Sequence, residues 1–100
     1  MKLNSPKIYK NRKAKNHPGI EIESNSKIWK NMTITHNPTK KNRYIVLKDK
    51  INPDDSRKSY VQKYLRKDPI KTRGERLKKY KLSENDLEQI KNYLDKNKKC

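Results

Sequence analysis

The 100-residue sequence has no phenylalanine, only two glycines and one cysteine. The scarcity of cysteine and of glycine each excludes a class of structure. Cys100 is the lone cysteine, so no internal disulfide can form and nothing calls for an oxidising compartment. With only Gly19 and Gly74, the chain has no glycine-rich loop to cradle a phosphate. No apolar run is long enough for a signal peptide or a membrane span. We therefore expect a cytoplasmic protein with no membrane partner.

Acidic residues are also scarce, because 11 Asp and Glu stand against 28 Lys and Arg, a formal net charge of +17. The mean hydropathy is -1.45. Leu, Ile, Val and Phe together make up less than about a fifth of the chain, a composition typical of disorder. Six tyrosines, one tryptophan and apolar periodicity between residues 19 and 65 nevertheless predict a folded centre.

The positive charge predicts an anionic partner, and nucleic acid is the default because each neutralised phosphate releases counterions. Codons rich in A and T offer another explanation, since Lys, Asn and Ile are all frequent here. Lysines that accumulate through codon bias should be scattered, whereas a binding surface should cluster them. The stretch 2–15 contains six positive side chains and no acid, which favours clustering.

Local patterns divide the chain into a basic N-terminal arm, residues 1–16, and one small domain, residues 17–97. The alternating runs "HPGIEIE" and "KIWKNMTIT", separated by "SNS", predict a β-hairpin with a bulge or bend near residues 28–32. The apolar run "RYIVLKD" predicts a central strand. The stretch "RKSYVQKYLRK" fits a strand or a helix, and we favour a strand; "DPIKTRGERLKKYK" reads as a basic linker.

The clearest local signal predicts a C-terminal helix over residues 83–97. Ser83 suits the N-cap position, and Leu82 can pack against Leu87 as a hydrophobic staple. Leu87, Ile90 and Leu94 then form one apolar stripe that can pack on a sheet. We expect a mainly β fold, a small SH3-like barrel or curved antiparallel sheet closed by this α-helix.

The two histidines suggest chemistry on RNA. Each lies next to a turn signal, His17 in "NHPG" and His36 in "THNP", and a hairpin would bring the two to one end of a sheet. RNA cleavage needs a base for the ribose 2'-hydroxyl, an acid for the leaving oxygen, and donors for the charge on phosphorus. Imidazoles suit the first two roles, so His17 and His36 are candidate acid and base, with Thr35 as a donor. The alternative is that both histidines are ordinary turn residues.

Cations interleaved with aromatic rings predict contact with single strands, through phosphates and base stacking. The interleaved residues are Arg57, Lys58, Tyr60, Tyr64 and Arg66. Tyr60 belongs to this set if it faces solvent; at strand spacing it could instead be core. The pattern offers no zinc signature, and we expect no metal or cofactor. The candidate nucleic-acid-binding residues are Lys13, Lys15, Lys40, Lys41, Arg43, Arg57, Lys58 and Tyr60.

The order "HPGIEIE", "MTITH", "YIVL", "NPDDSRKSYVQ" and "KLSENDLEQIKNYL" resembles the toxins of the MazF and PemK type, small SH3-like barrels that cut single-stranded RNA. The resemblance implies that the family's catalytic Arg before Pro falls on His17 and its strand-end Thr on Thr35. It also implies an acidic protein partner such as an antitoxin. Two departures stand out, because position 17 is His rather than Arg and "SPKIYK" lacks the family's opening Gly-Asp.

Three functions remain open from the sequence. The first is a metal-independent endoribonuclease acting on single-stranded RNA, as a toxin-like factor of a bacterium, phage or mobile element. The second is a noncatalytic basic module that binds RNA, DNA or a nucleoprotein, including a phage-borne inhibitor. The third is a structural protein of a ribosome or virion. RNA is favoured over DNA as the partner.

Overall fold

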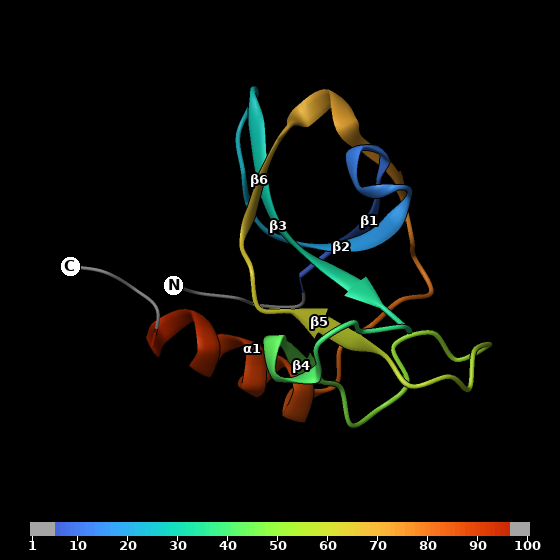
Figure 1. The fold of residues 1–100 in the computed structure, drawn as a ribbon. Coiled ribbons are helices and arrows are strands. Elements are labelled where there is room, and N and C mark those ends of the chain that lie inside the picture. The colour runs from blue at the N-terminus through green and yellow to red at the C-terminus, as the bar shows by residue number, and fades with distance from the viewer. Residues whose placement is uncertain (1–5, 97–100) are drawn as a thin grey trace.

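The protein folds into a curved, seven-stranded antiparallel sheet with one C-terminal helix (Figure 1). The computed structural model describes residues 6–96, except for the side chain of residue 41. In chain order the elements are β1 (Ile8–Asn11), η1 (Arg12–Ala14), β2 (His17–Ser24), β3 (Ile28–Thr35), η2 (Lys41–Arg43), β4 (Tyr44–Val46), β5 (Tyr60–Gln62), β6 (Arg66–Pro69), η3 (Ile70–Thr72), β7 (Arg73–Arg76) and α1 (Glu84–Lys96).

Strand β3 organises the sheet, whose order is β4-β5-β3-β2-β1-β7. One edge of β3 pairs with β2, and the other pairs first with β6 and then with β5. Within residues 6–96, β4 pairs only with β5 and β7 only with β1, so the sheet is not closed. The predicted mainly β fold, a curved antiparallel sheet with a C-terminal helix, is confirmed.

The β2–β3 hairpin forms as its alternating sequence predicts. Its turn is closed by Asn25, whose Oδ1 accepts hydrogen bonds from the backbone N–H groups of Lys27 and Ile28 at 2.8 and 2.9 Å. Asn and Asp side chains stabilise turns in this way. The hairpin therefore brings the start of β2 alongside the end of β3.

The hairpin also contains the irregularity expected near the start of β3. Glu21 pairs with Asn31, whereas Glu23 pairs with Lys30, so Ile22 is one extra residue on β2. This is a β-bulge, which increases the local twist of the pair. The bulge lies on β2, opposite the change of phase in β3.

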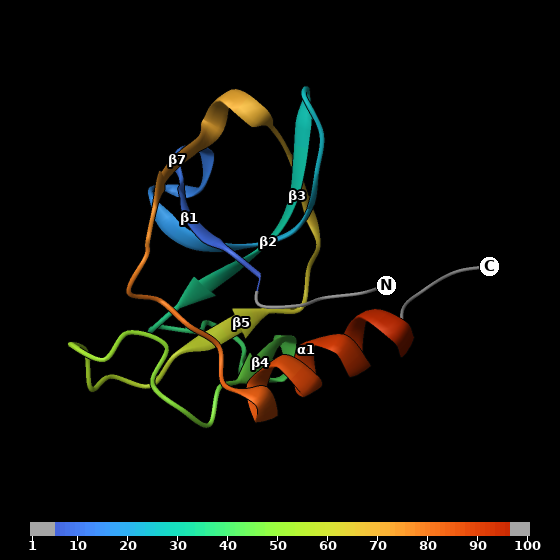
Figure 2. The ribbon, with the colours of Figure 1, turned by 180° about the vertical axis from the view of Figure 1, so that it is seen from behind.

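The apolar core lies between the sheet and α1, which runs beside β4 and β5 (Figure 2). Ser83 Oγ accepts from the backbone N–H of Asp86 at 3.2 Å, which is the predicted N-cap. Asp86 is buried and accepts from the backbone N–H groups of Lys48 and Asp49 at 2.7 and 3.0 Å. The first turn of α1 is thus fastened to the loop after β4. The buried core residues are Ile8, Ile20, Ile22, Met32, Ile34, Ile45, Leu47, Ile51, Val61 and Ile90.

Three details of the predicted organisation differ in the structure. The predicted arm contains strand β1, which belongs to the sheet because it pairs along its length with β2, and Ile8 is only 1% exposed. The predicted linker is wrong, because it contains η3, β7 and part of β6. The strand β4 lies at one end of the sheet rather than at its centre.

Candidate functional site

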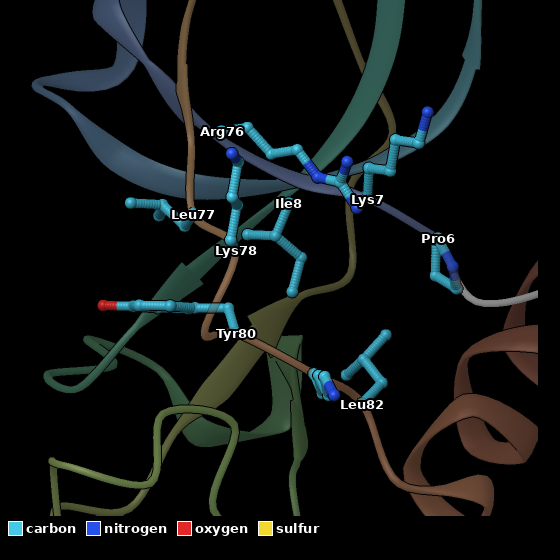
Figure 3. A pocket seen from close by; sticks show the side chains of 9 residues that line it. Pro6, Lys7, Ile8, Arg76, Leu77, Lys78, Tyr80 and Leu82 are labelled. Atoms are coloured by element: carbon cyan, nitrogen blue, oxygen red, sulfur yellow. The ribbon is translucent and has the colours of Figure 1, made fainter.

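Several cavities open on the described surface, and they differ in what lines them. One of about 280 Å³ lies between β1 and the segment that leads into α1 (Figure 3). Its walls combine lysines and Arg76 with side chains such as Leu77 and Tyr80, which also pack against the core. None of the residues predicted to act on RNA lines it. It is lined by Pro6, Lys7, Ile8, Arg76, Leu77, Lys78, Tyr80, Lys81 and Leu82.

A second cavity, here called the His17 cavity, has a volume of about 320 Å³ and a wide opening. It forms where η1, the start of β2 and the end of β3 meet β4, β5 and β6. Its lining combines cations, hydroxyls, an imidazole and a phenol, and includes no carboxylate. The lining residues are Lys13, Ala14, Lys15, His17, Thr33, Thr35, Tyr44, Gln62 and Arg66.

The turn before β2 sets the position of His17. Lys15 and Asn16 have left-handed backbone conformations, with φ of 54° and 62°. The turn is closed by a 2.9 Å hydrogen bond from Asn16 N to Asn11 O, and Asn11 Oδ1 accepts from Lys13 N at 3.0 Å. Non-glycine residues in this conformation cost free energy, and Asn is among the residue types that adopt it most readily. The turn places two lysines and His17 at the same cavity.

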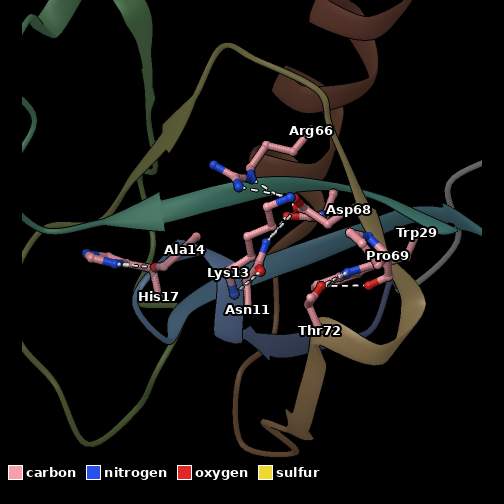
Figure 4. Close-up of polar contacts among 10 residues, drawn as sticks. Asn11, Lys13, Ala14, His17, Trp29, Arg66, Asp68, Pro69 and Thr72 are labelled. Atoms are coloured by element: carbon pink, nitrogen blue, oxygen red, sulfur yellow. Dashed lines mark hydrogen bonds and ion pairs between the residues drawn. The ribbon is translucent and has the colours of Figure 1, made fainter.

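The ring of His17 is exposed and oriented by one hydrogen bond (Figure 4). Its Nδ1 lies 2.9 Å from the backbone oxygen of Ala14. Because a carbonyl oxygen can only accept, Nδ1 carries the proton in this contact. The neutral ring then has its lone pair on Nε2, where it can accept a proton from a ligand.

A buried polar network lies beneath the cavity and holds Arg66. Asp68 is 3% exposed, and its Oδ2 accepts from the Nδ2 atoms of Asn11 and Asn31 at 2.9 and 3.0 Å. Arg66 donates to both oxygens of Asp68, from Nε at 3.0 Å and from Nη2 at 3.1 Å (Figure 4). This paired contact orients the guanidinium, which lines the His17 cavity.

The charge of Asp68 is stable at neutral pH. Burial raises the pKa of this carboxyl, but the hydrogen bonds from Arg66, Asn31 and Asn11 outweigh burial and lower it to about 2. The same ion pair raises the pKa of Arg66 above its usual range. Asp68 therefore acts as a permanent anionic anchor for Arg66.

The two threonines of the cavity come from one face of β3. Thr35 Oγ1 accepts from the backbone N–H of Asn37 at 3.2 Å. Thr33 Oγ1 is buried, and within the described residues it is the one buried side-chain oxygen or nitrogen with no hydrogen-bond partner. Such a group costs free energy, and hydroxyls left unpaired in a native protein call for an explanation.

The structure brings His17 and Thr35 together but places His36 elsewhere. The Nδ1 of His36 lies 3.1 Å from Lys58 O, and its Nε2 lies 3.4 Å from Asp55 Oδ2. His36 does not line the His17 cavity. The reason is strand geometry, because adjacent residues point to opposite faces and Thr35 takes the face of the cavity. The two imidazoles therefore do not converge on one bond.

His36 instead belongs to a charged cluster in the loop between β4 and β5. Arg57 Nη2 donates to Asp55 Oδ2 at 2.7 Å. The side-chain and backbone hydrogen bonds from Arg57 hold the pKa of the Asp55 carboxyl well below its usual range, and His36 adds to this effect. This cluster joins the end of β3 to the loop, which is a structural role.

The predicted nucleic-acid-binding residues are likewise divided. Lys13 and Lys15 line the His17 cavity, whereas Arg57 and Lys58 line a different one, with Lys48 and Lys50. Tyr60 is half-buried in β5, opposite Thr35, Lys40 is exposed, and Arg43 borders a cavity described below. The side chain of Lys41 lies outside the described residues.

The sequence-based candidates lacked Thr33, Tyr44 and Gln62 of the lining, whereas Arg66 belonged to the predicted set of interleaved cations and rings. Strand alternation from Thr35 could have indicated Thr33, since residues two apart share a face. Tyr44 and Gln62 are direct partners in the β4–β5 ladder, a pairing that no local pattern reveals. What the sequence did not show is the ion pair with Asp68, which sets where the Arg66 guanidinium lies.

The lining of the His17 cavity suits an anion with several oxygens. Cations attract it, hydroxyls and an amide can donate to it, and no carboxylate repels it. Among residues 6–96, no cluster of three or more His, Cys, Asp and Glu side chains could hold a metal ion. No helix in this part of the chain is long and apolar enough to span a membrane.

The chain was also compared with known proteins. It matches no protein-family model, no curated protein and no solved structure.

Proposed function

We propose that this protein binds single-stranded RNA at the His17 cavity. The observation that carries the proposal is the lining itself, which gathers Lys13, Lys15 and Arg66 around an imidazole without any carboxylate. These cations come from two distant parts of the chain, so it is folding that brings them together around His17. Neutralising phosphates in this way releases counterions and drives binding.

The other lining groups favour a single strand over a duplex. Tyr44 offers a ring on which a base can stack, and the Gln62 amide can donate to and accept from a base edge. Bases are accessible to such groups only when they are unpaired. Thr35 is a hydroxyl that could contact the ribose 2'-hydroxyl, which distinguishes RNA from DNA.

Binding is tested by fluorescence anisotropy with a labelled single-stranded RNA of mixed sequence. The double variant Lys13→Ala/Lys15→Ala should weaken binding and make the slope of log K against log salt less steep by about 1.4, since each single-strand phosphate contact contributes about 0.7. The matched control is Lys48→Ala/Lys50→Ala, which removes the same charge from a different cavity. Equal losses in both variants would mean that only net charge matters and would contradict the proposal.

Endoribonuclease activity is the second candidate, and one observation favours it. The two positions on which the MazF and PemK resemblance places catalytic groups, His17 and Thr35, line the same cavity. In this reaction His17 Nε2 takes the proton from the 2'-hydroxyl, and the 2'-oxygen forms a bond to phosphorus. The bond to the 5'-oxygen breaks, and the leaving oxygen takes a proton from water. Arg66 and the lysines stabilise the charge on phosphorus.

A separate experiment tests for endoribonuclease activity. Purified protein is incubated with RNA in EDTA, and the products are examined for a 2',3'-cyclic phosphate end. His17→Ala should abolish cleavage while binding persists, whereas His36→Ala should retain most of the activity. An RNA with a 2'-deoxy nucleotide at the cut position should resist cleavage. Absence of cleavage by wild-type protein that binds RNA would leave the noncatalytic module as the function.

A further inference from the structure

Another open cavity, of about 440 Å³, adjoins the His17 cavity. The two cavities share one lining residue, Gln62 of β5, so they are adjacent. This cavity, here called the Tyr64 cavity, also has no carboxylate in its lining. It is lined by Asn42, Arg43, Gln62, Lys63, Tyr64 and Tyr93.

Strand pairing explains why the two cavities are neighbours. Tyr44 and Gln62 pair in the β4–β5 ladder and both line the His17 cavity. The next residue on each chain, Arg43 before β4 and Lys63 after β5, is held by a 2.8 Å hydrogen bond from Lys63 N to Arg43 O. The ladder thus ends with two cations side by side at the Tyr64 cavity.

Tyr64 is the most exposed of the large hydrophobic side chains among the described residues, at 58%. Its backbone is well held, because Tyr64 N donates to Gln62 O at 2.8 Å. An exposed ring next to two cations is the arrangement that binds single strands, because a base stacks on the ring while the cations contact phosphates. The core has few large apolar side chains, and yet the Tyr64 ring lies in solvent, where a ligand can reach it, rather than in the core.

We infer that an RNA strand bound at the His17 cavity continues past Gln62 into the Tyr64 cavity, where one base stacks on Tyr64. The inference rests on the proposed function and deepens it. The ligand is then an extended single strand of several nucleotides rather than a mononucleotide or a duplex. Stacking on a ring tolerates any base, so binding at Tyr64 adds affinity without sequence preference.

The test combines an oligonucleotide length series with substitution of Tyr64. For wild-type protein, the affinity for RNA should rise steeply from a dinucleotide to an octanucleotide, because the longer strand also fills the Tyr64 cavity. Tyr64→Ala should weaken octanucleotide binding about 10-fold, in the range expected for loss of one base–aromatic stack. Tyr64→Phe keeps the ring and should bind like wild type. The folded state of each variant is checked by circular dichroism.

Each alternative outcome is informative. Octanucleotide binding that Lys13→Ala/Lys15→Ala weakens and Tyr64→Ala leaves unchanged would overturn the continuation and leave the proposed function intact. Loss of binding in Tyr64→Ala alone, without any effect of the lysine variant, would also overturn it, because the strand would then not begin at the His17 cavity. Absence of binding by wild-type protein would overturn both proposals.

Discussion

The two sides of β3 are buried in different ways. Asn31 and Met32 are adjacent in the strand and both are 0% exposed, yet they point to opposite faces. Met32 joins the apolar core next to α1, whereas Asn31 joins the network of Asp68, Asn11 and Arg66. A chain with few aliphatic residues therefore builds one face by burying aliphatic side chains and the other from a hydrogen-bond network beside the buried Trp29. The candidate site lies over the hydrogen-bonded face.

This difference separates two physical roles. Apolar burial is non-directional and insensitive to pH, so it stabilises the fold without placing any group exactly where chemistry needs it. Hydrogen bonds to a buried anion fix both distance and direction. The first face should therefore control stability at every pH, and the second should control the geometry of Arg66.

The largest change in stability is expected when a buried side chain of the apolar face is truncated. Ile90→Ala removes a side chain that is 0% exposed and should lower the free energy of unfolding by about 2 to 5 kcal/mol, measured by urea denaturation. The control is Ile28→Ala, since Ile28 is 37% exposed and surface substitutions usually change stability by less than about 0.5 kcal/mol. Similar losses in both would contradict the assignment of the core.

A smaller effect is expected when the buried anion is neutralised. Asp68→Asn should lower the free energy of unfolding at pH 7 by about 2 kcal/mol, because the pKa of Asp68 is about 2 when folded and 3.8 ordinarily. A lowered pKa stabilises the fold above pH 4, and this contribution is lost as pH falls from about 4 to about 2.

The pH dependence distinguishes the two faces. Between about pH 4 and pH 2, the difference between wild type and Asp68→Asn should vanish, whereas the difference for Ile90→Ala should persist. Asp68→Asn should also weaken RNA binding, since Arg66 loses its anionic anchor. A stability difference that stays constant with pH would show that the charge of Asp68 contributes nothing.

The smallest effect concerns the two threonines of β3. Thr33→Val replaces a buried, unpaired hydroxyl by a methyl group of similar size and should raise the free energy of unfolding by up to about 1 kcal/mol. Thr35→Val should instead lower it by a similar amount, because Thr35 Oγ1 accepts from Asn37 N. Thermal unfolding of both variants measures these changes in stability. Changes of the same sign in the two variants would contradict the prediction.

Local sequence patterns were sufficient for the apolar face. The N-cap at Ser83, the stripe that includes Ile90 and the alternation in β2 and β3 are short-range signals, and each corresponds to an observed element. Hairpin reasoning also led to His17 and Thr35, which line one cavity. What these signals share is apolar periodicity or turn chemistry within about a dozen residues.

The hydrogen-bonded face was not predictable in the same way. The segment containing β6 and β7 resembles a linker because it has almost no apolar alternation, yet Asp68 is buried through partners 37 and 57 positions away. The expected partnership of His17 and His36 depended on which face each side chain takes at a strand end.

Gly19 illustrates the same limitation. A Cβ there would lie 3.0 Å from Asn31 Oδ1 and 3.1 Å from Trp29 Cη2, so these two side chains would have to shift by a few tenths of an ångström to admit a larger residue. One of the two glycines in the chain is therefore favoured by close packing rather than by a turn. Nothing in its local sequence distinguishes this preference.

The open sheet has a consequence for how copies of the protein behave together. Within residues 6–96 the outer edges of β4 and β7 pair with no further strand, and in other proteins such edges invite edge-to-edge aggregation. Here mutual repulsion between molecules that each carry +17 opposes that contact. A polyanion that neutralises this charge would also weaken the repulsion, so solubility should depend on the ratio of protein to nucleic acid, with precipitation near charge balance.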